Sequence, residues 1–346
     1  MSFKRLEADD FVVSADSISA TLWSGGTPTL TSFYTSSTQE AGSSGDYYLN
    51  VYQTESNDAN AAVQFALAYG NSNGSGSAVY NTSVDGKSPT STIFGQYQNL
   101  VIGDENTNFA FASITSSEFF ALSVDRARYK EKLFLGSLTL NISGSSGSIS
   151  LTDNSAYVSS VQFNEAGRVF QLITGSQGTK ATISSRNTSE GYSANSGSYG
   201  WLLPDIGTII LNPLALADSL TNGGIGFQYS GSSTGSAAPT VTPNRSLFQA
   251  ISGSSSFRLN SEETITSDYI FVRARSSEFN YSENPSYISG STGEVLYSSF
   301  INSPQTYITT VGLYNDTNEL LAVAKLSRPL LKDFTKEALV RVKLDF

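Results

Sequence analysis

The sequence predicts a mainly β protein, built from antiparallel sheets or sandwich-like domains with a few short helices and long Gly/Ser-rich loops. The first reason is composition. The 346 residues include 18 Tyr and 20 Phe, and only 14% are charged; aromatic and β-branched side chains suit the pleated surface of a sheet. The second reason is spacing, because short apolar stretches recur about every ten residues between Gly- and Ser-rich turns.

Changes in composition divide the chain into four expected segments. They are an extended N-terminal arm (1–45), a β-rich domain with one short helix (46–142), a β-meander or sandwich region (143–246) and a C-terminal β block (247–346). Within them, we expect one strand-like piece at 19–26 and a mobile loop at 230–245, where the sequence is Ser/Gly-rich.

Individual strands are predicted where β-branched and aromatic residues lie between turn residues. These strands are 47–53, 61–70, 108–114, 118–125, 147–153, 156–163, 168–175, 180–185 and 208–211. One short helix is expected within 90–103, capped by Thr92. A second follows Asn212, which is placed at the N-cap with Pro213 at the first helical position.

The clearest local structure lies near the C-terminus. Residues 308–314 and 320–326 are predicted to be antiparallel strands joined by a turn at 315–319, where Asn and Asp favour turn backbone. Apolar residues occur on both faces of the second strand, which suggests burial on both sides. The terminal strand "ALVRVKLDF" alternates between an apolar and a charged face, and we expect it to join the same sheet as this hairpin.

These two strand patterns give the residues we expect to form core or assembly contacts, with Phe346 ending in apolar surroundings. They are Val311, Leu313, Tyr314, Leu321, Val323, Val340, Val342, Leu344 and Phe346. Deleting the last seven residues is therefore expected to give an insoluble or unassembled product.

Charge and residue content exclude several function classes. The net charge is −10, and an acidic surface repels phosphate backbones and anionic membranes, so we expect neither a nucleic-acid nor a membrane partner. The chain has no Cys and no His, which removes thiol chemistry, the Ser-His-Asp triad and ordinary zinc sites. Carboxylates, Lys and Tyr remain available, so an enzyme is disfavoured rather than excluded. The N-terminus lacks the apolar stretch of a signal peptide.

Short motif matches do not support a catalytic, metal or cofactor site. "GSSTG" at 231–235 resembles a nucleophile elbow, but Ser233 has no His as its base. "DGKS" at 85–88 has Asn81 where a phosphate-binding loop needs Gly. The acidic stretches at 103–106, 261–263 and 314–319 lack the spacing of a calcium loop. We therefore predict no catalytic, cofactor-binding or metal-binding residues and no cofactor.

Several stretches of the chain resemble virion proteins of contractile-tailed bacteriophages (myophages). They are "DYIFVRARSSEFNYSENPSYISG", "PQTYITTVGLYNDTNELLAVAKLSRPLLKDF", the ending "VRVKLDF", "VQFALAYGNSNGSGSA", "STIFGQYQNLVI" and "SVDRARYKEKL". In outline they look like structural proteins of the tail baseplate, including its β-rich wedge component. The resemblance implies a virion protein that is made in the bacterial cytoplasm, contacts other virion proteins and associates with itself.

The sequence thus leads to the hypothesis of a non-enzymatic structural subunit of a phage tail, assembled through β-rich interfaces. Two alternatives come from other classes. One is a receptor- or carbohydrate-binding module on the virion surface, which exposed Tyr and Trp beside Asn or Asp would indicate. The other is a carboxylate-dependent polysaccharide-degrading enzyme, which needs two carboxyl groups across one cleft.

Overall fold

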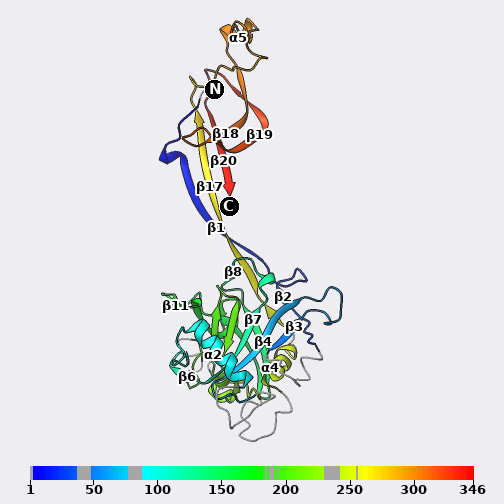
Figure 1. Cartoon of the computed structure of the whole chain (residues 1–346). Coiled ribbons are helices and arrows are strands. Elements are labelled where there is room, and N and C mark those ends of the chain that lie inside the picture. Colours follow the sequence, from blue (N-terminus) through cyan, green and yellow to red (C-terminus); the bar gives the residue numbers. More distant parts are fainter. Residues whose placement is uncertain are drawn as a thin grey trace. The chain divides into compact units, whose positions relative to one another are not determined.

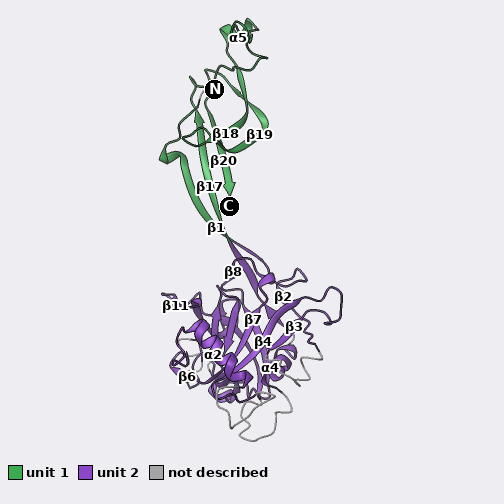
Figure 2. Cartoon of the chain, viewed as in Figure 1, with its two compact units in different colours: residues 1–17, 264–346 green, residues 18–263 purple. Residues whose placement is uncertain are grey.

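The computed structural model describes residues 3–36, 48–76, 88–183, 185–186, 191–192, 195–229, 242–254 and 256–346. Among these described residues, strands account for 42% and helices for 14%, which confirms the predicted mainly β fold with few short helices (Figure 1). The chain divides into two compact units. Residues 1–17 and 264–346 form unit 1, and residues 18–263 form unit 2 (Figure 2).

These units do not coincide with the four segments expected from the sequence. The division falls within two strands, β1 (Phe11–Thr21) and β17 (Asn260–Ala274). The expected boundary between 142 and 143 lies inside β9 (Thr139–Gly144), which pairs directly with the next strand. Strand pairing therefore joins segments that differ in composition. The backbone hydrogen bonds between strands do not depend on where Ser- and Gly-rich stretches lie in the sequence.

Unit 2 is built on one large sheet. Its main path runs in the order β2-β16-β9-β10-β12-β14-β15-β7-β4-β3, and every strand pair recorded along it is antiparallel. The strands of this unit other than β9 are β2 (Thr29–Leu30), β3 (Tyr48–Tyr52), β4 (Val63–Asn71), β5 (Phe109–Phe111), β6 (Ile114–Ser116), β7 (Glu118–Val124), β8 (Lys132–Leu133), β10 (Gly147–Asp153), β11 (Gln162–Asn164), β12 (Gly167–Ser176), β13 (Thr179–Lys180), β14 (Gly200–Leu203), β15 (Thr208–Leu211) and β16 (Phe257–Arg258).

Both faces of the central strands are buried. In β7, Phe120 and Leu122 face one apolar core, and Phe119 and Ala121 face a second core on the opposite side. The same alternation occurs in β14, β15 and β4. A strand covered on both faces favours consecutive apolar residues, which explains the stretches "FFAL" in β7 and "IIL" in β15.

Helix α2 (Pro89–Val101) covers the second core with Ile93 and Phe94, and packs against β4. This confirms a helix within 90–103, but the predicted cap was wrong. Ser88 occupies the N-cap and Pro89 the first helical position, so the Thr92 hydroxyl lies inside the first turn and donates to the Ser88 carbonyl at 3.3 Å.

Two further helices cover the first core. They are α3 (Pro213–Ala217) and α4 (Pro243–Ser252), which bury Leu216 and Leu247 among others. The prediction for α3 is confirmed, because the Asn212 side chain accepts a hydrogen bond from the Leu214 amide. Short 3-10 turns are η2 (Arg126–Arg128) and η3 (Leu220–Asn222).

Several predicted strands are shorter or divided. The stretch 108–114 forms β5 and the start of β6, because Ala112 adopts a φ of 56° and turns the chain between them. Of 156–163 only Gln162 and Phe163 belong to a strand, and of the described part of 180–185 only Lys180 does; residue 184 lies outside the described residues. Of the predicted loop at 230–245, residues 230–241 lie outside the described residues. The last three positions already belong to α4.

The predicted N-terminal arm is more ordered than expected over its described part. The strand-like piece at 19–26 was placed too far along the chain, because β1 begins at Phe11 and ends at Thr21. Leu22 and Trp23 then turn into the first core of unit 2, where the Trp23 ring lies 4.9 Å from that of Phe257. Residues 37–45 lie outside the described residues.

Unit 1 joins the two ends of the described chain. Its elements are η1 (Ala8–Asp10), β1, β17, α5 (Ser299–Asn302), β18 (Thr306–Tyr314), β19 (Leu320–Lys332) and β20 (Ala338–Asp345). The strands β1, β17 and β20 form one sheet in that order, and β18 and β19 form the predicted antiparallel hairpin. The expectation that the terminal strand joins the hairpin's sheet was wrong, because β20 pairs with β17 along eight positions.

Candidate assembly surface in unit 1

The sheet of unit 1 has one apolar and one charged face, as the alternation of its terminal strand predicts. Ile270 and Val272 of β17 lie opposite Val342 and Val340 of β20, on the face that packs against the hairpin. On the other face, the guanidinium of Arg341 and the ammonium of Lys343 both lie over the Tyr269 ring, at 5.7 and 5.8 Å from its centre. The second face is thus charged and open to solvent, and on it Lys343 forms an ion pair with Asp345 at 2.8 Å.

The hairpin supplies the other half of this small core. The inward residues of β18 and β19 pack against β17 and β20, with Leu313 buried most deeply. Its turn is built as expected, because the Asn315 side chain accepts hydrogen bonds from the amides of Thr317 and Glu319 at 3.1 and 2.8 Å. The pairing is irregular at Thr309, because Ile308 pairs with Leu330 and Thr310 with Lys325. Residues 326–329 of β19 therefore have no paired partner, and Pro329 does not occupy a position in the hydrogen-bonded ladder.

The nine residues expected to form core or assembly contacts fall into two groups. Five of them belong to this core, namely Val311, Leu313, Val340, Val342 and Leu344. The other four are exposed, namely Tyr314, Leu321, Val323 and Phe346.

The expectation of apolar surroundings for Phe346 was wrong. Its side chain is 76% exposed, although its amide donates to the Thr266 carbonyl at 2.9 Å. Among the described residues, the second face of the hairpin is also not buried, since Leu321 is 68% and Val323 58% exposed. The Phe3 ring meets the Tyr314 ring edge-on at 5.3 Å on this outer face. An apolar outer face of this kind is typical of a surface that another chain covers.

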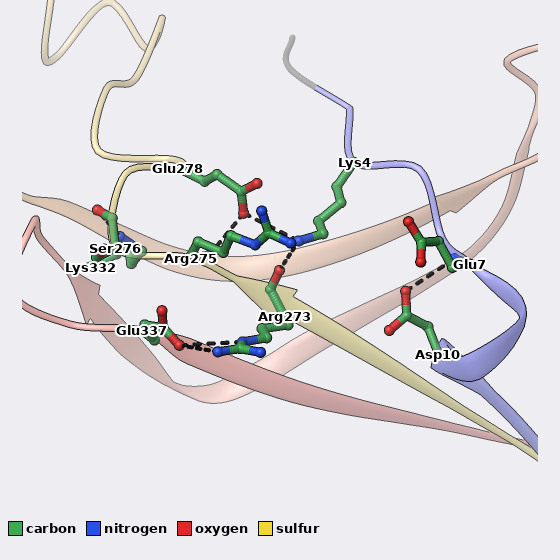
Figure 3. Close-up of polar contacts among 9 residues, drawn as sticks. All are labelled: Lys4, Glu7, Asp10, Arg273, Arg275, Ser276, Glu278, Lys332 and Glu337. Atoms are coloured by element: carbon green, nitrogen blue, oxygen red, sulfur yellow. Dashed lines mark hydrogen bonds and ion pairs between the residues drawn. The ribbon is translucent and has the colours of Figure 1, made fainter.

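Polar contacts fasten the N-terminal segment to the C-terminal half of unit 1 (Figure 3). The Lys4 ammonium donates to a Glu278 carboxylate oxygen at 3.2 Å and to the Arg273 carbonyl at 2.5 Å. The Arg273 guanidinium in turn donates to Glu337 at 2.7 and 3.3 Å. The Arg275 amide and, secondarily, Lys4 hold the pKa of the Glu278 carboxyl below its usual range. The sequence analysis did not predict these contacts, because the residues that make them are far apart in the chain.

Lys332 at the end of β19 is fully buried. Its ammonium donates to the Ser276 carbonyl, the Asn280 side-chain oxygen and the Asp333 carbonyl at 3.0, 2.8 and 3.0 Å. All three donor positions of the ammonium are therefore used, and the loop after β17 is tied to the end of the hairpin.

Replacing Lys332 by Met should destabilise unit 1 by about 2–3 kcal/mol, because buried acceptors lose their donor. Lys325→Met on the same strand is the matched control, because Lys325 is exposed, and it should change the unfolding free energy by less than about 0.5 kcal/mol. Denaturant unfolding of the two variants measures the difference. Equal effects would mean that the Lys332 hydrogen bonds contribute no stability.

The residues of strand β1 are largely exposed to solvent. Ten of its eleven residues are exposed, including Phe11, Val12 and Val13. It lies at one end of the sheet order, so within the described part of the chain no strand adjoins its outer edge. Ordering each residue costs about 1–2 kcal/mol of backbone entropy, and this strand buries almost nothing to offset that cost. The run "FVV" was the sequence signal for this strand, and it was overlooked within the expected arm.

A group of four aromatic rings lies in the connection between β17 and β18. The rings of Tyr287 and Phe300 are stacked at 5.2 Å with an interplanar angle of 11°. Tyr281 meets Tyr287 edge-on at 5.7 Å, and Tyr297 meets Phe300 edge-on at 5.8 Å. The two outer tyrosines are 54% and 57% exposed, so they are held at the surface by packing beneath them.

One carboxylate of unit 2 has an environment that resembles a catalytic site. Both oxygens of Glu118 accept hydrogen bonds from tyrosine hydroxyls, one from Tyr69 and one from Tyr229, and the Asn71 amide donates at 3.2 Å. Burial, followed by the nearby Glu118 charge, raises the pKa of both tyrosines, so the hydroxyls stay protonated and donate. Hydrolysis of glycosides needs two carboxyl groups. Among the described residues, the recorded hydrogen bonds of this cluster include one carboxylate, Glu118.

The described ranges contain no group of three or more acidic side chains placed to hold a metal ion. None of the helices described is both long and apolar enough to cross a membrane.

Comparison with known proteins leaves the geometry of unit 1 as the guide to function. No known family model, no curated protein and no solved structure matches this chain.

Proposed function

We propose that this chain is a non-enzymatic structural subunit of a contractile-tailed phage virion, placed in the tail baseplate, and that it assembles through unit 1. The single observation that carries the proposal is β1, an ordered strand of eleven residues whose faces and outer edge lie open. Such a strand is a template for pairing with another chain. The baseplate assignment is supported by the sequence resemblance of the hairpin and the terminal strand.

The outer face of the hairpin gives the proposal a second surface. Leu320, Leu321 and Val323 form an exposed apolar stretch beside Tyr314. Neighbouring virion proteins would cover it, and the resulting permanent interfaces would stabilise a subunit whose unit 1 has a small core of its own.

Labelling of particles tests this role. An antibody against unit 2 should mark one end of the tail in phage particles released by cells that carry the gene, and a particle map should show more than about 1,000 Å² of each copy's surface in contacts. Particles that lack the chain, while it accumulates free in the lysate, would overturn the proposal.

A second candidate function, carbohydrate binding, is favoured by the aromatic group beside Tyr287. Tyr281 and Tyr297 present exposed rings held by edge-on packing, and Glu283 and Asn284 follow Tyr281 by two and three positions in the chain. Rigid aromatic rings with adjacent polar groups suit the apolar faces and hydroxyls of sugars, because little entropy is lost on binding.

Tyr281→Ala and Tyr297→Ala should each weaken glycan binding about tenfold, which corresponds to about 1.4 kcal/mol for one lost ring contact. Tyr307→Ala is the control, because this tyrosine is also exposed but lies on β18, outside the aromatic group. A glycan array with the whole chain, followed by calorimetry on any sugar retained, measures the effect. Absence of binding to host surface glycans would remove this candidate, and turnover of a polysaccharide would favour an enzyme instead.

A further inference from the structure

The sheet of unit 1 has two open edges that belong to different strands. The order β1-β17-β20 puts β1 at one end and β20 at the other, as Figure 1 shows in blue and red. Natural proteins protect exposed edges with Pro, Lys, bulges or shortness, but Phe11–Thr21 is long and contains no Pro, Lys or Arg. The missing protection indicates that another strand occupies the β1 edge in the assembled state.

Charge decides which strand suits this edge. Asp16 is the charged residue within β1 and the sixth of its eleven positions, so antiparallel pairing of β1 with a second β1 would place Asp16 opposite its own copy in the centred register. Like charges directly opposite destabilise a strand pair. Pairing of β20 with a second β20 would likewise bring Arg341 and Lys343 of one copy beside those of the other.

Pairing of unlike edges removes both conflicts. On the open face of the sheet, β20 presents Arg341 and Lys343, both over the Tyr269 ring, and Lys343 is paired with Asp345 of the same strand at 2.8 Å. Strand β1 contains one acidic residue, Asp16, and no basic residue. Pairing of β1 with β20 of a second copy therefore brings an anion toward these cations in place of a like charge. The exposed Leu339 side chain on that face would also be covered.

We propose that β1 of one copy pairs with β20 of a second copy, so that the sheet of unit 1 continues from chain to chain. The inference rests on the assembly role proposed above and names its partner as a second copy of this chain. Because the two edges differ, the contact is heterologous, and each copy can use both of its edges in a ring or a longer array.

Disulfide trapping tests the contact directly, since the chain contains no Cys of its own. The variants are Asp16→Cys, Arg341→Cys and Lys343→Cys, made singly in the full chain. Two positions on one face of β20 are thereby tested as partners of position 16. Mixing the first variant with either of the other two under mild oxidation should convert at least half of the chains to the mixed disulfide. Within one chain β17 separates β1 from β20 by roughly 10 Å, beyond disulfide reach, so the bond reports contact between copies.

Two controls make the result decisive. Asn60→Cys, exposed in unit 2, mixed with Arg341→Cys measures random collision. Asp16→Cys alone measures pairing of β1 with itself. Trapping at or below the random level, or more disulfide from Asp16→Cys alone than from the mixtures, would overturn the inference.

A charge exchange gives an independent readout that does not depend on cysteine reactivity. Asp16→Lys should raise the dissociation constant of self-association about fivefold or more, and Asp16→Lys combined with Arg341→Asp should restore it, as sedimentation would measure. Failure of the double variant to restore association would also count against the contact. If the chain enters particles but no β1–β20 disulfide forms, this inference fails while the proposed function stands. If the disulfide forms but the chain does not enter particles, the contact between copies stands while the proposed function fails.

Discussion

Deletion of residues 340–346 should unfold unit 1 and leave unit 2 folded. The deletion removes most of β20 and therefore its ladder with β17, together with Val340, Val342 and Leu344 from the core of unit 1. Val342 is buried and the other two side chains are half-buried, so the loss is on the order of 5 kcal/mol. That is comparable with the whole stability of a small domain, so unit 1 should not remain folded.

Unit 2 should survive because its cores contain no residue from the deleted segment. Every member of both cores lies between Leu22 and Leu259. Limited proteolysis of the truncated chain should therefore degrade the region after residue 263 and leave a protected fragment, whereas the intact chain should be protected throughout both units. The truncated chain should also fail to enter particles.

Single substitutions separate the roles of the terminal residues. Val342→Ala should destabilise unit 1 by about 2 kcal/mol, because it empties a buried position. Phe346→Ala should leave unfolding unchanged within about 0.5 kcal/mol, because that ring is exposed. If the truncated chain resists protease as the intact chain does and still enters particles, the terminal strand is dispensable and the assembly proposal loses its second edge.

The strands and turns that depend on local sequence were predictable. The hairpin strands at 308–314 and 320–326, the strand β15 and the cap at Asn212 all follow from residue types within a few positions of one another, whereas the extension of β19 to Lys332 was not predicted. Turn residues and Asn caps act through their own neighbouring backbone, so their effect can be read without knowing the fold. The mainly β class follows in the same way from composition.

What could not be predicted depends on partners distant in the chain. Nothing near β20 indicates that it pairs with β17 rather than with the adjacent hairpin, and nothing near Lys332 indicates that Ser276 and Asn280 lie around its ammonium. For Phe346, alternation predicted a face shared with Val342 and Leu344, but Phe346 lies beyond the end of β20 and outside the core that contains these two residues. The apolar cover of that face, however, ends before the last residue. Periodicity fixes the side on which a residue lies but not how far its neighbours extend along the strand.

The candidate assembly surface also contains residues that the sequence predicts and a strand that it does not. Leu313 and Val342 were recognised because apolar alternation in a strand predicts a core. Strand β1 was overlooked because its residues carry no alternation of apolar and polar faces, and a strand that buries neither face within its own chain has no reason to show one. Its lack of pattern therefore agrees with the proposed contact with another chain, and sequence periodicity alone does not reveal such a strand.

Gly200→Ala should destabilise unit 2 by about 3 kcal/mol or more, lowering its melting temperature by on the order of 10 °C. Gly200 begins β14 opposite Leu211 of β15, in the middle of the large sheet, and its φ is +147°. An added Cβ would lie 1.9 Å from the Ile210 carbonyl oxygen, which belongs to the paired backbone and cannot rotate away. The substitution therefore combines an unfavourable dihedral with a backbone clash.

The same chemical change at Gly95 should have the opposite sign. Gly95 lies inside α2 with a negative φ, and a Cβ there would meet nothing within 4 Å. Ala is favoured over Gly in a helix interior by about 0.5–1 kcal/mol, so Gly95→Ala should raise the stability of unit 2 slightly. Calorimetry of both variants against the unchanged chain measures the two shifts, with the transition of unit 1 as an internal reference in each scan. Two shifts of the same sign and size would mean that β14 and β15 do not approach each other at Gly200 in this register, and the order of the central sheet would have to be drawn again.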